Sequence, residues 1–415
     1  MMHMEGIIDS LFRLAYIERW NDHPKPFSIT ELDKQAHKAC VAFLFAKMEE
    51  KERGRRIDWA GLINGLLFEA FQRSVLTDIK PQLFHRVLRA NRNSVNEYVF
   101  QCFKDIFSAD DLDFFEEMKS YFENDQYLFW EKRIVTAAHF IATYWEFQFV
   151  YQIASGIYGI DETKREIDNK VEEFVDLIGV QKFLLQRKTH GFIDICGQLR
   201  FQKRWIQTPR VPQTSVLGHA FMVAVLAYLL ARVRSRNKNT CNKRWWYGSF
   251  FAGLFHDLPE IATRDIISDV KSVLGKEIVR KMEIEEVEKR ILPLLPAYII
   301  PEMKFFLGIP NGNDYDKMQV DEFSDRVLED GNLRVVGDIA SYCYGDDGGN
   351  GLIPIDGKLL RLCDRLVAFA ETVYSLSHGI RSADLEKAFQ NLYKELQREE
   401  EVRSLVNQLH ARVPA

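Results

Sequence analysis

Residues 219–233 read HAFMVAVLAYLLARV, and this stretch decides the fold class. Nearly all of its residues are apolar and neither glycine nor proline interrupts it, which is typical of a helix buried on all sides. Residues 367–376 read in the same way, whereas 277–291 and 383–409 mix charged and apolar residues at helical spacing. Alternating strand patterns bounded by turn residues are nearly absent. We therefore predict an all-α fold.

Length, composition and charge exclude several classes of protein. The chain has 415 residues, 47% of them hydrophobic, which is enough for a sizeable core. A formal net charge of −5 argues against a protein dominated by contacts to nucleic-acid phosphates. The longest apolar run is too short to span a bilayer, the N-terminus lacks a signal-peptide pattern, and the six cysteines are scattered. We expect a cytoplasmic protein with reduced thiols and with no membrane or nucleic-acid partner.

The two halves of the chain share short motifs in the same order, which indicates an internal duplication. Arg19-Trp20 in the first half recurs as Arg204-Trp205 in the second. The further pairs are HKACVA from His37 and HAFMVA from His219, GLLFEA from Gly65 and GLFHDL from Gly253, TDIK from Thr77 and SDVK from Ser268, and KRIV from Lys132 and DRLV from Asp364. We predict two domains, residues 1–185 and 186–415.

The two copies differ at the positions where a metal site would need ligands. The second copy has His219, His256, Asp257 and Asp364, and we align these with His37, Phe68, Glu69 and Lys132 of the first. A phenyl ring offers no lone pair and an ammonium group repels a cation, so we predict a metal site in the second copy alone. The second copy also carries an insertion at about 300–357, which we expect to border the site as a cap or lid.

Two imidazoles and two carboxylates suit one divalent transition metal, Mn²⁺, Fe²⁺, Co²⁺ or Ni²⁺, with Mg²⁺ less favoured. Four protein ligands on an octahedral ion leave one position for a water and one for a substrate oxygen. Such an ion lowers the pKa of the water and polarises the group under attack. An isolated His-Asp pair would be a core histidine beside a capping aspartate. Here further ionisable residues lie in apolar helices, where each needs a partner, and the metal interpretation is favoured.

Two carboxylates follow the His-Asp pair. Glu260 lies four residues after His256, so a continuous helix would put both on one face, where the carboxylate could position the metal-bound water. Asp265 could act as the general acid for the leaving oxygen. The alternatives are a solvated helix residue for Glu260 and a cap or loop carboxylate for Asp265.

The Arg204-Trp205 pair lies fifteen residues before His219. An arginine suits bidentate phosphate binding, and a tryptophan offers an apolar face to a sugar or base. The recurrence of the pair in the copy without metal ligands slightly favours a structural role, but we predict Arg204 and Trp205 as substrate-binding residues.

These residues resemble the HD-domain superfamily of metal-dependent phosphohydrolases, whose pattern H…HD…D is matched by His219, His256-Asp257 and Asp364. The preceding Arg-Trp and the sequence HDLPEIATRD are most similar to the HD-domain 5′-deoxynucleotidases, which remove phosphate from deoxyribonucleoside monophosphates. The resemblance covers about 203–377. It implies tandem HD-like helical bundles with a degenerate N-terminal copy, catalytic assistance by Glu260 and Asp265, and phosphate binding by Arg204. It also implies association of two such domains, as a homodimer or an internal pseudo-dimer.

The leading hypothesis is therefore a phosphohydrolase that acts on nucleoside 5′-monophosphates or related small phosphate esters. A phosphodiesterase or nucleoside triphosphohydrolase is the enzymatic alternative. A metal-containing nucleotide sensor or interaction module is the alternative from another class. The carboxylates Glu260 and Asp265 favour an enzyme, because a pure binder does not need acid–base groups beside the metal.

Overall fold

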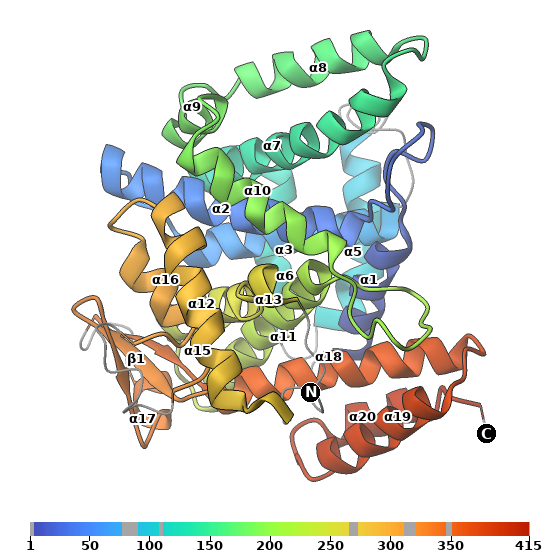
Figure 1. The fold of residues 1–415 in the computed structure, drawn as a ribbon, viewed down its shortest axis with the longest axis vertical. Coiled ribbons are helices and arrows are strands. Elements are labelled where there is room, and N and C mark those ends of the chain that lie inside the picture. The colour runs from blue at the N-terminus through green and yellow to red at the C-terminus, as the bar shows by residue number, and fades with distance from the viewer. Residues whose placement is uncertain are drawn as a thin grey trace. The chain divides into compact units, whose positions relative to one another are not determined.

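The structure is a computed structural model, and it describes residues 4–76, 90–107, 111–264, 273–310, 320–345 and 351–414. They divide into two compact units, Met1–Leu185 and Gln186–Ala415. Helices dominate both units (Figure 1), and the prediction of an all-α fold is confirmed apart from one small sheet. All six cysteines are free thiols.

The first unit is helical throughout its described part. Its helices are α1 (Met4–Tyr16), α2 (Glu31–Arg53), α3 (Trp59–Leu76), α5 (Arg92–Phe107), α6 (Leu112–Glu123), α7 (Phe129–Ala154), α8 (Ile160–Glu172) and α9 (Ile178–Leu184). Helix α2 packs against α7 and α3. The charged side chains of Lys34 and Lys38 are buried on α2 among its apolar residues. This helix therefore carries polar groups that need partners inside the unit.

The second unit is built around α11 (Val216–Asn237), α12 (Lys243–Phe255) and α18 (Gly357–Ser377). Helices α19 (Ala383–Leu396) and α20 (Arg403–His410) lie beside α18 in Figure 1 and contact it. The shorter helical segments are α10 (Lys188–Gln198), η1 (Leu199–Phe201), α13 (Glu260–Thr263), α15 (Lys276–Glu286), η2 (Val287–Ile291), η3 (Leu292–Leu294), α16 (Ile300–Phe306) and α17 (Ala340–Cys343).

Helix α11 is the core helix of this unit. Ser215 begins it by accepting a hydrogen bond from the Gly218 amide at 2.9 Å, which is a normal N-cap. Helix α12 approaches closely because Gly253 has no side chain: a Cβ there would lie 2.7 Å from the Cα of Ala224. By length and composition alone α11 could cross a membrane, but 94% of its apolar window is buried inside the protein. Core helices of soluble proteins share these properties, so the composition of α11 is weak evidence for a membrane span.

A three-stranded antiparallel sheet with strand order β2-β1-β3 lies within the predicted insertion. Its strands are β1 (Arg326–Glu329), β2 (Asn332–Val335) and β3 (Ile353–Ile355), with Leu328 paired to both Leu333 and Ile353. This sheet was not expected from the sequence. Strands of three or four residues are too short to display an alternating pattern.

A buried arginine fastens β1 to the rest of the insertion. The side chain of Arg326 is fully buried and donates hydrogen bonds of 2.7–2.9 Å to four backbone carbonyls, those of Phe305, Phe306, Glu322 and Ser324. Burial of the guanidinium lowers the pKa of Arg326 to about 9. This single side chain therefore satisfies acceptors from α16 and from the segment just before β1.

We expect Arg326→Met to lower the free energy of unfolding by roughly 2–4 kcal/mol, because buried carbonyls would lose their donors. Denaturant unfolding measures the change. The control is Arg334→Met on β2, whose salt bridge to Glu329 joins two exposed side chains and should contribute much less to stability. Equal losses in the two variants would contradict the assignment of Arg326 as the anchor.

Each unit has the same turn in front of its first long core helix. Trp20 and Trp205 adopt left-handed backbone conformations, with φ of 55° and 57°. Thr30 then caps α2 and Ser215 caps α11, each pairing with the strand-like residue that lies two positions before the tryptophan. Positions on α2 and α11 can therefore be compared by counting from their N-caps, Thr30 and Ser215.

Counted from these caps, Lys34 occupies the position of His219, since each lies four residues after its cap. This count from the caps differs by three residues from the alignment of His37 with His219. A histidine that two segments share does not fix its position on a helix, whereas the N-cap does. His37 instead packs its ring edge-on against Trp145 at 5.0 Å.

Candidate metal centre

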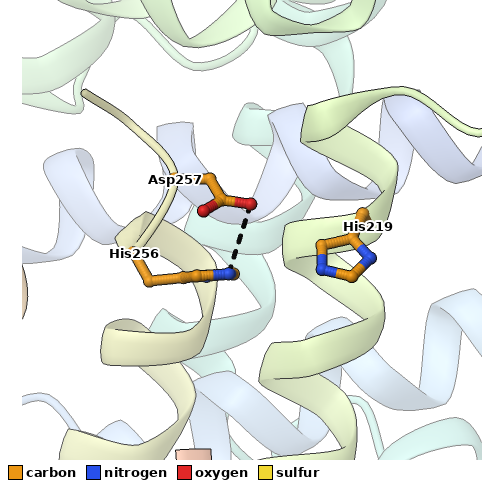
Figure 2. A group of neighbouring side chains, drawn as sticks. All are labelled: His219, His256 and Asp257. Carbon is orange, nitrogen blue, oxygen red and sulfur yellow. Dashed lines mark ion pairs between the residues drawn. The ribbon is translucent and has the colours of Figure 1, made fainter. Parts of the chain in front are cut away.

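Three predicted ligands meet between α11 and α12. His219 lies in the first turn of α11, His256 ends α12, and Asp257 follows it. One ligand atom from each residue lies within 4.8 Å of the others, and both histidines are buried. Figure 2 shows the three side chains gathered in the space between the two helices. Among the described residues, no other such group is close enough to hold a metal ion.

The fourth predicted ligand comes from α18. Its carboxylate belongs to Asp364, whose Oδ1 lies 2.8 Å from Nε2 of His219. Two consecutive helices, α11 and α12, and the distant helix α18 thus bring two imidazoles and two carboxylates into one cluster. The ligand types are those that bind divalent transition metals.

The contacts of His256 show that the cluster suits a cation. Its Nδ1 lies 2.8 Å from the carbonyl oxygen of Gly253, which can only accept, so Nδ1 carries the hydrogen. In the neutral ring Nε2 is then an acceptor, and it lies 3.2 Å from the Oδ2 acceptor of Asp257. Two acceptors at this distance need a cation between them, either a proton or a metal ion.

The pKa values of His256, Asp257 and Asp364 also indicate that the cluster attracts positive charge. Burial lowers the pKa of His256, but the Asp257 and Asp364 carboxylates outweigh burial and raise the pKa of His256 to about 9. Burial raises the pKa of Asp257, but His256 and Arg204 hold the pKa of Asp257 well below its usual range. For Asp364, the hydrogen bond to His219 similarly outweighs burial and lowers the pKa. The carboxylates are ionised and attract positive charge.

A buried carboxylate that the sequence analysis missed supports the cluster. Glu371 on α18 accepts hydrogen bonds from the Trp205 indole at 2.9 Å and from the Thr214 hydroxyl. Its Oε1 also lies 3.6 Å from an Arg210 nitrogen and 3.7 Å from Nδ1 of His219. Burial raises the pKa of Glu371, but Arg210 and the other donors hold it well below its usual range. The sequence does contain one sign of this role. Glu371 is a lone carboxylate in an apolar run, two helical turns after Asp364, and a buried carboxylate needs partners.

The Arg204-Trp205 pair lies at the cluster, and the two side chains have different partners. One terminal nitrogen of Arg204 is 3.4 Å from Oδ2 of Asp257, and its Nε is 3.7 Å from Oε2 of Glu371. Trp205 directs its indole N–H to Glu371, so this hydrogen bond anchors the turn. The geometry puts Arg204 beside the candidate ligands and gives Trp205 a structural contact.

Glu260 does not lie on the same helix as His256. Helix α12 ends at Phe255 and a short helix, α13, begins at Glu260, so the predicted continuous helix from His256 is wrong. Pro259 explains the break, because proline lacks an N–H and clashes with the carbonyl four residues earlier. Glu260 is nevertheless buried, and its amide donates to the Asp257 carbonyl at 3.0 Å. Asp265 lies outside the described residues.

The insertion reaches the cluster through one aromatic ring. Phe323, just before β1, lies with its ring centroid 6.3 Å from that of His256. The Arg361 guanidinium of α18 lies 5.1 Å from the centroid of the same ring. The insertion therefore borders the site, as its position in the sequence suggested.

Comparison with known proteins agrees with this geometry. Residues 196–393 match the HD domain family, and the matched region lies wholly within the second unit. A search of curated proteins gave no match. HD domains bind divalent metals and are in general metal-dependent phosphohydrolases. The matched region includes His219, His256 and Asp257, whose ligand atoms are close enough together to hold a metal ion.

Proposed function

We propose that the second unit is a divalent-metal-dependent phosphohydrolase that removes phosphate from (deoxy)nucleoside 5′-monophosphates. Its metal ligands would be His219, His256, Asp257 and Asp364. The observation that carries the proposal is the cluster of His219, His256 and Asp257, whose ligand atoms all lie within 4.8 Å of one another. The ligand types favour one Mn²⁺, Fe²⁺, Co²⁺ or Ni²⁺ ion over Mg²⁺.

The surrounding residues have roles that follow from their chemistry. A bound divalent ion would activate a water and polarise the phosphoryl group. Arg204, beside Asp257, would offset negative charge on the phosphate. Glu260 would position the water, and Asp265 would give a proton to the leaving alkoxide as the ester P–O bond breaks. Trp205 would act by holding the turn that carries Arg204.

We also propose that the first unit is a degenerate HD-like copy. The shared turn and cap support this, as does a common glutamate: Glu146 on α7 accepts from the Trp20 indole at 3.2 Å, as Glu371 does from Trp205. Seven residues before these glutamates lie His139 and Asp364. His139 therefore replaces Lys132 as the counterpart of Asp364, and it contacts Lys34 as Asp364 contacts His219.

The test is phosphate release from a panel of ribo- and deoxynucleoside mono-, di- and triphosphates with Mn²⁺, Co²⁺ or Mg²⁺ added. We expect release from monophosphates that depends on metal and is lost in Asp257→Ala. The matched control is Asp384→Ala, an exposed aspartate on α19, which should leave the rate unchanged. Release from triphosphates or diesters alone would replace the proposed substrate, and metal binding with no release from any compound would favour a sensor.

A further inference from the structure

The first unit contains an open cavity of about 510 Å³, formed by residues of α2, α3, α5, α6 and α7 and of the segment after α6. Pockets for small molecules commonly have this volume. Its walls combine cationic side chains, among them Arg73, Arg92 and Lys132, with aromatic rings from Tyr121, Phe122 and Phe140. Two carboxylates, Glu69 and Asp125, also line the cavity.

Most of the charges in the cavity already have counterions. Arg92 pairs with Asp125 at 2.6 Å. Glu69 pairs with Lys38 at 3.0 Å and also accepts from the Tyr121 hydroxyl at 2.9 Å. These pairs neutralise both carboxylates of the lining.

Lys132 is the exception. Its Nζ donates to the Asn124 carbonyl at 2.6 Å and lies 4.8 Å from the centroid of the Tyr121 ring. Within the described residues, no carboxylate oxygen lies within 4 Å of this nitrogen. Lys132 therefore brings a positive charge without a directly paired carboxylate to a partly buried surface, where an anion would be attracted.

A buried acceptor also lines the cavity. Gln35 is 1% exposed, and its Nε2 donates to Oε1 of Glu31 at 2.6 Å. Its Oε1 is buried and has no hydrogen-bond partner among the described residues. Because buried polar atoms are nearly always paired, this oxygen indicates a missing donor, such as a ligand hydroxyl or amino group.

A metal ion does not suit this unit. At the position that corresponds to His219 of the second unit, Lys34 contacts Nδ1 of His139 at 2.5 Å. Phe68 is buried against the rings of Phe114 and Tyr121 and supplies no ligand atom. Basic side chains occupy the place where the second unit gathers metal ligands.

We propose that this cavity binds a small organic phosphate without a metal ion, of the size of a nucleoside monophosphate. Lys132 binds the phosphate, Gln35 accepts from a hydroxyl or amino group of the ligand, and the aromatic rings contact its apolar part. The site is separate from the metal centre and does not depend on the proposed hydrolysis.

The test is calorimetric titration of the full-length Asp257→Ala variant, in EDTA, with adenosine 5′-monophosphate and with inorganic phosphate. We expect the nucleotide to bind and phosphate alone to bind more weakly. Lys132→Gln should reduce nucleotide affinity tenfold or more, and Lys132→Arg should retain it. Lys104→Gln removes the same charge from an exposed position outside the cavity and should have no effect.

The pH dependence of nucleotide affinity tests whether Lys132 is the group that binds the phosphate. Burial lowers the pKa of Lys132 to about 8. The carboxylates of Asp125 and Glu69 oppose this shift, and the Arg92 guanidinium adds to it. Tyr121 and His139 also face the cavity. The affinity for the nucleotide should therefore fall as pH rises from 7 to 9.5, where its phosphate, with a second pKa of about 6, is already almost fully doubly charged. The profile of Lys132→Gln should be flat. Absence of binding by both probes at millimolar concentration, or equal affinity in the folded Lys132→Gln variant, would overturn the proposal.

Discussion

Asp364→Ala should reduce divalent-ion affinity by at least about 100-fold and phosphate release by about 10³-fold or more. The substitution removes one of two carboxylates from a site whose net attraction for a cation depends on both. It also removes the acceptor that lies 2.8 Å from Nε2 of His219, so that imidazole would lose the contact that fixes its orientation. Titration with Mn²⁺ and measurement of phosphate release test both effects.

A double variant separates a shared metal site from independent roles. If His219 and Asp364 hold one ion, the double substitution His219→Ala, Asp364→Ala should be no slower than the slower single variant, because neither residue acts without the other. Independent roles would make the two losses multiply. Circular dichroism and thermal unfolding confirm that each variant is folded. Retained metal binding and activity in Asp364→Ala would remove this residue from the proposed ligand set.

The fold was predictable where one stretch of sequence carried the whole signal. Residues 219–233 indicate a buried helix because nearly all of them are apolar, and α11 is that helix. The sheet of the insertion was not predictable, because strands of three or four residues leave no periodic pattern. The break before Glu260 could have been predicted from Pro259, because a helix from His256 cannot continue through a proline without losing a hydrogen bond.

The candidate site was predictable in its ligand types and less so in its supporting contacts. His256 and Asp257 are adjacent, and a histidine and an aspartate in apolar helices need partners, so their convergence could be anticipated. Glu371 was missed because its donors, Trp205 and Thr214, come from a turn more than 150 residues earlier in the chain. Tertiary structure alone brings such groups together.

Glu371→Gln should destabilise the second unit by about 3 kcal/mol or more and reduce kcat/KM by about 10- to 100-fold. Both carboxylate oxygens accept from donors, the Trp205 indole and the Thr214 hydroxyl, whereas an amide presents one acceptor and one donor. The amide N–H₂ would therefore face a donor, and Arg210 and Arg204 would lose a buried counterion. Activity should fall because Arg204 would no longer be held beside Asp257.

Glu146→Gln in the first unit is the matched control for this effect. Glu146 is buried and accepts from the Arg19 Nε at 2.8 Å and from the Trp20 indole at 3.2 Å, so its substitution should destabilise its own unit comparably. Phosphate release should remain near the parent rate, because no proposed metal ligand or catalytic residue belongs to the first unit. Hydrogen exchange can locate the loosened segments in each variant. If Glu146→Gln slowed phosphate release as much as Glu371→Gln, the loss would reflect general destabilisation, and the positioning of Arg204 by Glu371 would be refuted.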